Sequence, residues 1–99
     1  MWYAVMSEDN HDSLSARLGA RQAHISRLTE LRDAGRLLIA GPHPAADTEE
    51  PGSAGFTGSL VVVDFPSLEA AEEWAAKDPY KDAGVYRNVV VKPFKLLLP

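Results

Sequence analysis

Cysteine is absent from the sequence, and its absence excludes several kinds of chemistry. A chain without cysteine has no disulfide cross-link, no thiolate nucleophile and no cysteine-ligated zinc or iron–sulfur site. Histidine is scarce as well, and its three copies show neither the H-x₃-H nor the H-E-x-x-H spacing. His11 beside Asp12, and His43 with Asp47, are therefore only weak candidate ligands, and we expect no metal. A glycine-rich phosphate-binding loop is missing too, and we expect a protein that works without a cofactor.

An excess of basic residues is also missing. Ten Lys and Arg against fourteen Asp and Glu give a formal net charge of −4, which argues against nucleic-acid and membrane partners. No long hydrophobic run is present: Met1–Met6 is apolar, but it lacks a basic segment and is too short for a signal peptide or a membrane span. With 45% hydrophobic and 24% charged residues, the 99-residue chain is predicted to be one cytoplasmic globular domain, residues 1–99.

Two segments have the sequence pattern of helices. In residues 13–34, apolar side chains recur at helical spacing, with Ser13 as the expected N-cap and Gly35 as the left-handed residue that ends the helix. A second helix is predicted over residues 68–77, where Ser67 is the expected N-cap. An Asp-Pro pair follows this helix and ends it, because a residue before proline is disfavoured in helical geometry.

The remaining apolar segments are predicted to be strands. They cover residues 2–6, 37–40, 59–65 and 85–98, and an irregular loop is expected over residues 43–57. The order β-α-β-β-α-β predicts an α+β fold, the ferredoxin-like sandwich, in which two helices cover one face of an antiparallel sheet. Pro93 in the last strand requires an edge position or a bulge.

The face of the sheet away from the helices is predicted to be apolar as well. Residues 60–63, Leu-Val-Val-Val, do not alternate between apolar and polar. The last strand has Tyr86, Val90 and Phe94 on one side, and Val89 and Val91 on the other. Two helices cannot cover both faces, so a second copy packed sheet against sheet is the simplest way to bury the other one. We therefore expect a homodimer through the open sheet face; the alternative is a monomer with an apolar exposed sheet.

Three basic or titratable side chains share the apolar side of the first predicted helix. At about 100° per residue, Arg17, Arg21 and His24 fall within the apolar arc of this helix. That arc is made up of Leu18, Ile25, Leu28 and Leu31. Such a departure from apolar patterning often marks a functional site. The alternative is structural: a buried histidine with hydrogen-bond partners, and arginines whose stems lie along the apolar surface.

Asp78 and Ser59 are two further candidates. Asp78 lies at the C-terminal end of the second predicted helix, where the helix dipole disfavours an aspartate, although Asp-Pro is also a common turn. In the predicted fold both helices lie on one face, so Asp78 could orient the His24 ring and leave its other nitrogen as a general base. Ser59 opens a strand after Gly58 and could offer a hydroxyl group to a ligand, or simply begin the strand.

Several of these segments together resemble the YciI-like, or YCII-related, family. The resemblance rests on Arg17-x-x-x-Arg21-x-x-His24, Gly35-Arg36-Leu37-Leu38-Ile39-Ala40-Gly41-Pro42, Gly58-Ser59, Asp78-Pro79-Tyr80 and Ala83-Gly84-Val85. It implies a dimeric α+β barrel built from two ferredoxin-like protomers. It also implies an active site with a His–Asp pair, here His24 and Asp78, and with Ser59 and Arg17 as candidate pocket neighbours. Because a guanidinium binds anions, Arg17 or Arg21 would hold a developing oxyanion or a substrate carboxylate, and Arg17, Arg21 and Ser59 are the candidate substrate-binding residues.

Function is predicted less closely than fold. One branch of the resembled family contains a dehydrochlorinase, and the wider superfamily contains lactone isomerases and monooxygenases without metal or organic cofactor. The first hypothesis is a small enzyme of lyase or isomerase type, in which His24 and Asp78 transfer a proton on a small aromatic or carbonyl-bearing substrate. The alternative is a non-catalytic dimeric module that binds a small molecule or a partner protein.

Overall fold

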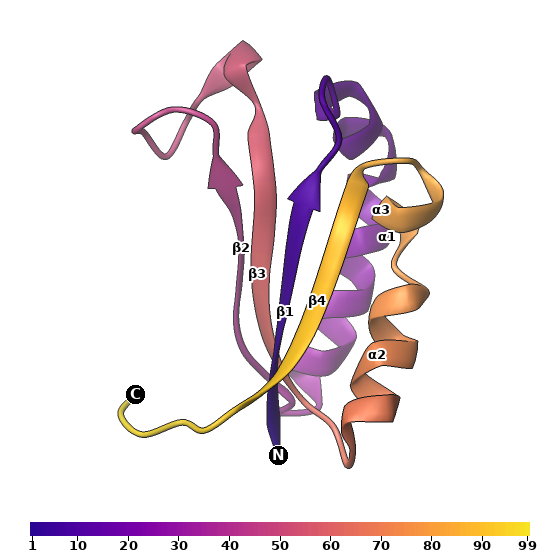
Figure 1. The fold of residues 1–99 in the computed structure, drawn as a ribbon, viewed down its shortest axis with the longest axis vertical. Coiled ribbons are helices and arrows are strands. Elements are labelled where there is room, and N and C mark those ends of the chain that lie inside the picture. Colours follow the sequence, from indigo (N-terminus) through magenta and orange to yellow (C-terminus); the bar gives the residue numbers. More distant parts are fainter.

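A computed structural model describes all residues, 1–99, and its four strands form one antiparallel sheet in the order β2-β3-β1-β4 (Figure 1). The elements are β1 (Trp2–Asp9), α1 (Leu14–Asp33), β2 (Leu37–Pro44), a 3₁₀ turn η1 (Gly52–Ala54), β3 (Phe56–Asp64), α2 (Leu68–Ala76), α3 (Pro79–Asp82) and β4 (Tyr86–Phe94). The predicted ferredoxin-like order is confirmed, with the short helix α3 as an addition.

The ends of the helices follow local side-chain chemistry. The hydroxyl group of Ser67 accepts a hydrogen bond from the Ala70 amide at 3.1 Å, and it caps α2 as predicted. Gly35 has a φ of +72°, the left-handed conformation expected after α1. Ser13 occupies the cap position of α1, but its hydroxyl group makes no cap hydrogen bond and instead donates to Asp9 at 2.9 Å. Ser13 is therefore the N-cap residue, as predicted, but its side chain makes no cap hydrogen bond.

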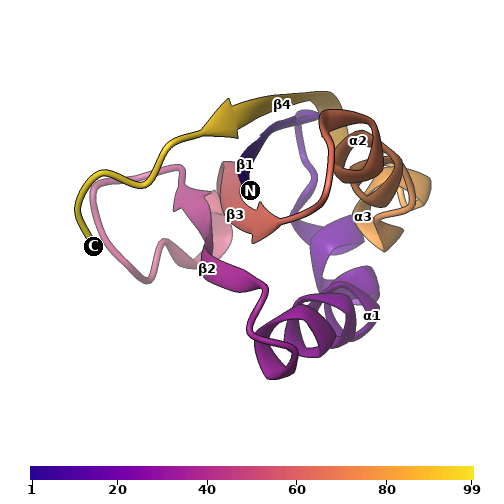
Figure 2. The same ribbon diagram turned by 90° about the horizontal axis from the view of Figure 1, so that it is seen from below.

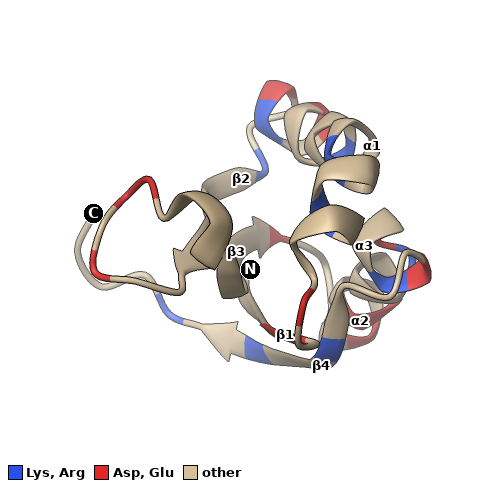
Figure 3. Cartoon of the chain, turned by 90° about the horizontal axis from the view of Figure 1, so that it is seen from above, with Lys and Arg blue, Asp and Glu red and all other residues tan.

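The helices lie together on one face of the sheet, and the hydrophobic core fills the space between the two layers (Figure 2). Buried apolar residues from β1, α1, β3 and α2 form this core: Val5, Leu28, Leu31, Val61, Val63 and Ala75. On the other side of the sheet lie the C-terminal segment and the connection between β2 and β3 (Figure 2). The acidic part of that connection lies far from α1 and α3 (Figure 3).

The strands differ from their predicted limits. Strand β2 passes through Gly41 and Pro42 and pairs with β3 as far as Pro44, because an edge strand tolerates proline. The predicted irregular loop over residues 43–57 is shorter for that reason: both of its ends belong to strands. Strand β4 ends at Phe94, so the prediction that the strand continues to residue 98 is wrong. Pro93 does lie in an edge strand, as the sequence required.

A bulge in β4 changes which face Tyr86 occupies. Glu8 pairs with Asn88, but the next residue of β1, Asp9, pairs with Tyr86, which leaves one extra residue in β4. Since an extra residue reverses the alternation of side chains beyond it, Tyr86 turns to the helix-covered face. The prediction that Tyr86 shares a face with Val90 and Phe94 is wrong, and the bulge is the reason.

The sheet face opposite the helices carries exposed apolar side chains. Ile39 on β2 is 51% exposed, and Val90 and Phe94 on β4 are 37% and 38% exposed. Leu97 and Leu98 beyond the sheet are exposed as well. None of the helices has both the length and the apolar character needed to cross a membrane.

Candidate functional site

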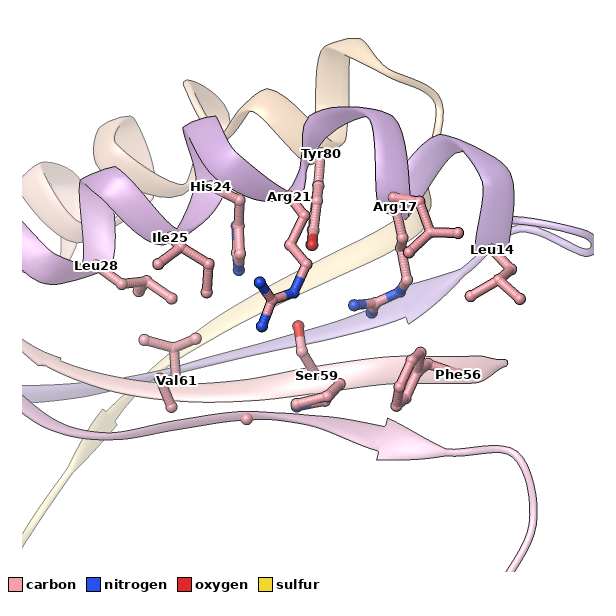
Figure 4. A pocket seen from close by; sticks show the side chains of 14 residues that line it. Leu14, Arg17, Arg21, His24, Ile25, Leu28, Phe56, Ser59, Val61 and Tyr80 are labelled. Carbon is pink, nitrogen blue, oxygen red and sulfur yellow. The ribbon is translucent and has the colours of Figure 1, made fainter. Parts of the chain in front are cut away.

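A cavity of about 350 Å³ lies between α1 and the β2–β3 side of the sheet (Figure 4). Its apolar lining includes Leu14, Leu18, Ile25, Leu28, Ala40, Pro42, Phe56 and Val61. Leu18 and Ile25 belong to the predicted apolar side of α1, yet they are 66% and 37% exposed. They line the cavity instead of the core, which explains why this helix has more apolar positions than its core contact needs. Exposed apolar groups beside a cavity are typical of ligand sites.

His24 and Asp78 form a buried pair at this cavity. The Nδ1 atom of His24 lies 2.9 Å from Oδ1 and 3.0 Å from Oδ2 of Asp78. A carboxylate accepts hydrogen bonds only, so Nδ1 carries a proton, and in the neutral ring Nε2 is then the nitrogen without one. Figure 4 shows the far end of the His24 ring pointing into the cavity. The two residues that the sequence paired are therefore brought together, with one nitrogen held and the other accessible.

Tyr80 fixes the orientation of the His24 ring. The two rings are stacked with centroids 3.9 Å apart and planes 9° apart. Burial raises the pKa of Tyr80, while the charges of Arg17 and Arg21 act in the opposite direction. Tyr80 therefore stays neutral and serves as a flat wall, so that the imidazole is held both by its edge and by its face.

Asp78 occupies a more favourable position than the sequence indicated. It is the N-cap of α3, and its Oδ1 accepts a hydrogen bond from the Tyr80 amide at 2.9 Å. An aspartate is stabilised at the N-terminus of a helix, whereas the C-terminal end of α2 would disfavour it. The short helix after Pro79 thus removes the predicted conflict and holds the carboxylate toward α1.

The two arginines on the same side of α1 have different surroundings. Arg17 is buried and donates through Nε and Nη2 to Asp9 at 2.5 and 3.0 Å, and through Nη2 to the Gly58 carbonyl at 3.0 Å. Burial acts to lower the pKa of Arg17, but its hydrogen bonds to Asp9 and the charge of Asp9 outweigh this and raise it. Arg21 also lines the cavity, but it is exposed and takes part in no ion pair.

Ser59 lines the cavity as part of a chain of hydroxyl groups. Its Oγ lies 2.7 Å from Ser7 Oγ and 3.4 Å from the Tyr86 hydroxyl, which donates to Asp78 Oδ2 at 3.5 Å. Burial, together with the nearby charge of Asp78, raises the pKa of Tyr86 to about 12. Since Tyr86 donates toward Asp78, its oxygen accepts from Ser59, and Ser59 in turn accepts from Ser7.

Several residues of the site were not predicted from the sequence: Ser7, Asp9, Phe56, Tyr80 and Tyr86. Asp9 had a weak signal, because it is an acid at the end of an apolar strand. Tyr80 belongs to the Asp78-Pro79-Tyr80 segment, but only α3 shows why its ring meets His24. Tyr86 had no signal, since its place depends on the bulge.

Metal-ligand candidates do not converge here. No three His, Asp or Glu side chains gather closely enough to hold a metal ion. His11 and His43, the weak candidates from the sequence, are both exposed and neither lines the cavity.

Comparison with known proteins shows the family to which this chain belongs. The sequence pattern of the YCII-related domain matches residues 1–95. The chain belongs to the YCII-related domain family. Among its YCII-related relatives, Protein YciI of Escherichia coli is 58% identical over 95 residues, which are 96% of this chain and 97% of that protein. A protein of Haemophilus influenzae is 52% identical over 95 residues, with the same coverage of both chains.

The YCII-related fold is also found in a solved enzyme structure. The 5-chloro-2-hydroxyhydroquinone dehydrochlorinase from Burkholderia phenoliruptrix superposes with a TM-score of 0.84 at 24% sequence identity. The match covers 96% of this chain and 94% of the dehydrochlorinase, which was solved in complex with 2,5-dihydroxybenzoquinone. This likeness confirms the ferredoxin-like fold class that was predicted from the sequence. The match to the YCII-related domain confirms the predicted resemblance.

Proposed function

We propose that this YCII-related protein is a small enzyme of lyase or isomerase type that uses His24 and Asp78 to move a proton on a small aromatic or carbonyl-bearing substrate. The observation that carries the proposal is the orientation of His24: Nδ1 is held by Asp78, and the other end of the ring points into a cavity with an apolar lining. That arrangement is what a general base requires.

The chemical step follows from the free nitrogen. Nε2 removes a proton from a carbon next to a carbonyl group, and the electron pair of the broken C–H bond forms an enolate. In an isomerase the proton returns from Nε2 to a different carbon. In a lyase the enolate electrons expel an anion such as chloride from the neighbouring carbon, and the proton passes from Nε2 to water. Asp78 stabilises the imidazolium that exists between the two steps.

The lining supports a small ring as substrate. A cavity of about 350 Å³ accommodates a molecule of one ring, and the side chains of Phe56 and Val61 offer it apolar contact. The dehydrochlorinase of the same fold was solved with a six-membered quinone, which supports an aromatic or quinone-like substrate here. Ser59, whose hydroxyl group lies at the cavity, would hold a polar substituent of that ring.

The proposed proton transfer is tested by solvent exchange. In deuterated water, NMR would follow the loss of C–H signals from a panel of cyclic ketones, 2-oxo acids and halogenated hydroquinones. We expect exchange with the wild-type protein and its loss, by about 10²-fold or more, in His24→Gln. His43→Gln, an exposed histidine outside the cavity, is the matched control. Binding of panel members without exchange would contradict the enzyme and favour the non-catalytic binding module.

We also propose that the protein is a homodimer in which two sheets pack face to face. The exposed side chains of Ile39, Val90 and Phe94 on the uncovered face support this arrangement, because such a surface is stabilised when a second copy buries it. Light scattering of the wild-type protein is expected to give twice the chain mass, and Val90→Glu is expected to give the monomer. A folded wild-type monomer at high concentration would contradict the dimer.

A further inference from the structure

The side chains that line the cavity include basic groups but no acidic ones. The charged or titratable side chains that line it are Arg17, Arg21, His24 and the neutral Tyr80, and no carboxylate is among the lining residues. Asp9 and Asp78 lie behind the lining, where each is bound to one of these basic groups. A ligand in the cavity therefore meets basic groups and apolar walls.

The charge of Arg17 is already balanced. Its side chain and that of Asp9 are 6% and 1% exposed, and the two form a double hydrogen bond. A guanidinium paired in this way with a buried carboxylate adds little net charge to its surroundings. A His24 ring with its proton on Nδ1 alone is neutral and adds no charge to the lining. The Asp78 carboxylate lies behind this ring and accepts hydrogen bonds from Nδ1 and from the Tyr80 amide.

Arg21 is the charged side chain of the lining that has no ion-pair partner. It takes part in no ion pair, and Figure 4 shows its guanidinium in the cavity, between the His24 ring and Ser59. The acidic connection between β2 and β3 lies on another side of the molecule and does not neutralise it (Figure 3). A guanidinium with free N–H groups beside an apolar wall binds carboxylate or enolate oxygens through paired hydrogen bonds.

We infer that the ligand of this cavity is a small organic monoanion, a mainly apolar ring or chain with one carboxylate or acidic hydroxyl group, and that Arg21 is its counter-ion. The inference concerns the cavity of the proposed function and names its substrate class. One unpaired arginine selects one negative charge. Bound to Arg21, the anionic group would place the adjoining carbon beside His24.

Benzoate and benzamide test this inference, because they have nearly the same shape and differ in charge. Calorimetry at neutral pH and low salt is expected to show benzoate bound by the wild-type protein at least tenfold more tightly than benzamide. Arg21→Gln is expected to remove that preference and leave benzamide binding within about twofold. Amide NMR shifts would show that the ligand lies between α1 and β3.

Two variants separate this inference from the proposed function. Arg32→Gln removes an exposed arginine from the same helix, outside the cavity, and is expected to leave the preference for benzoate unchanged. His24→Gln is expected to keep that preference while it loses solvent exchange. Equal binding of the two probes, no binding of benzoate at millimolar concentration, or a preference that survives in Arg21→Gln would each overturn the inference. If no substrate exchanges but the preference depends on Arg21, the proposed enzyme fails and the monoanion site stands.

Discussion

Two carboxylate–base pairs lie along α1, and they differ in how many of their atoms remain free. In the first, Asp9 accepts hydrogen bonds from Arg17 and Ser13, and Arg17 also donates to the Gly58 carbonyl. In the second, Asp78 holds Nδ1 of His24, while the far end of the ring faces a cavity. In the first pair both charged groups are buried and Arg17 also bonds to the backbone of β3, so this pair fastens α1 to the sheet. A pair with a free nitrogen is available for chemistry.

The aromatic neighbours of the two pairs show the same difference. The Arg17 guanidinium lies between the rings of Phe56 and Tyr80, 5.3 and 5.1 Å from their centroids. His24 has its ring stacked on Tyr80. Tyr80 thus contacts both pairs. It lies between the buried guanidinium of Arg17 and the imidazole of His24, which faces the cavity (Figure 4).

The largest expected effect comes from breaking the Asp9–Arg17 pair. In Arg17→Met the Asp9 carboxylate stays buried without its cation, and we expect the free energy of unfolding to fall by about 3 kcal/mol or more. Urea denaturation followed by circular dichroism measures it. Adding Asp9→Asn to this variant is expected to recover part of the loss, because no orphaned charge remains. A loss below about 1 kcal/mol in Arg17→Met would contradict the structural role of this pair.

A smaller loss of stability is expected from the second pair. In Asp78→Asn the side chain can still cap α3 and accept a hydrogen bond from Nδ1, so unfolding should become easier by only about 1 kcal/mol. Proton exchange on the substrate panel should nevertheless fall by about tenfold or more, since the imidazolium loses its counter-charge. The same denaturation series, run beside the exchange assay, compares the two effects. Equal losses of stability in Asp78→Asn and Arg17→Met would remove the distinction between the pairs.

The smallest effect is expected from Tyr86, which donates a single long hydrogen bond to Asp78. Tyr86→Phe should change stability by less than about 1 kcal/mol at neutral pH. Because the pKa of Tyr86 is raised from 10.0 to about 12, the unfolded chain loses this proton first, and native stability falls between those pH values. Stability measured across that range should fall less steeply in Tyr86→Phe than in the wild-type protein. An unchanged slope would mean that Tyr86 titrates normally.

The sequence predicted the layers of this fold because helices and strands have different periods of apolar residues. The Ser67 cap and the left-handed Gly35 were also predictable, since each depends on neighbours in the chain. Two residues of the site could be named from the sequence. His24 is a titratable side chain on the apolar side of a helix, and Asp78 is an acid at the predicted C-terminal end of a helix, where the dipole disfavours it. The proximity of the two side chains depended on the fold, and the structure supplies it.

Other parts of the site depended on geometry that no local pattern records. Tyr86 reaches Asp78 only because one extra residue in β4 reverses the alternation of its side chains. Asp9 meets Arg17 across eight residues of sequence, and the hydroxyl group of Ser13 donates to Asp9 and does not cap α1. Leu18 and Ile25 looked like core residues, because periodicity cannot distinguish an apolar core from an apolar cavity.

The central claim is that Asp78 keeps the proton of His24 on Nδ1 and leaves Nε2 free, and imidazole nitrogen NMR tests it most directly. In ¹⁵N-labelled wild-type protein, above the pH at which the ring is protonated, we expect a protonated Nδ1 and an unprotonated Nε2 for His24. The exposed His11 and His43 should instead show the averaged signals of rings that exchange between tautomers. A His24 ring that carries its proton on Nε2, or that averages like the exposed ones, would contradict the account.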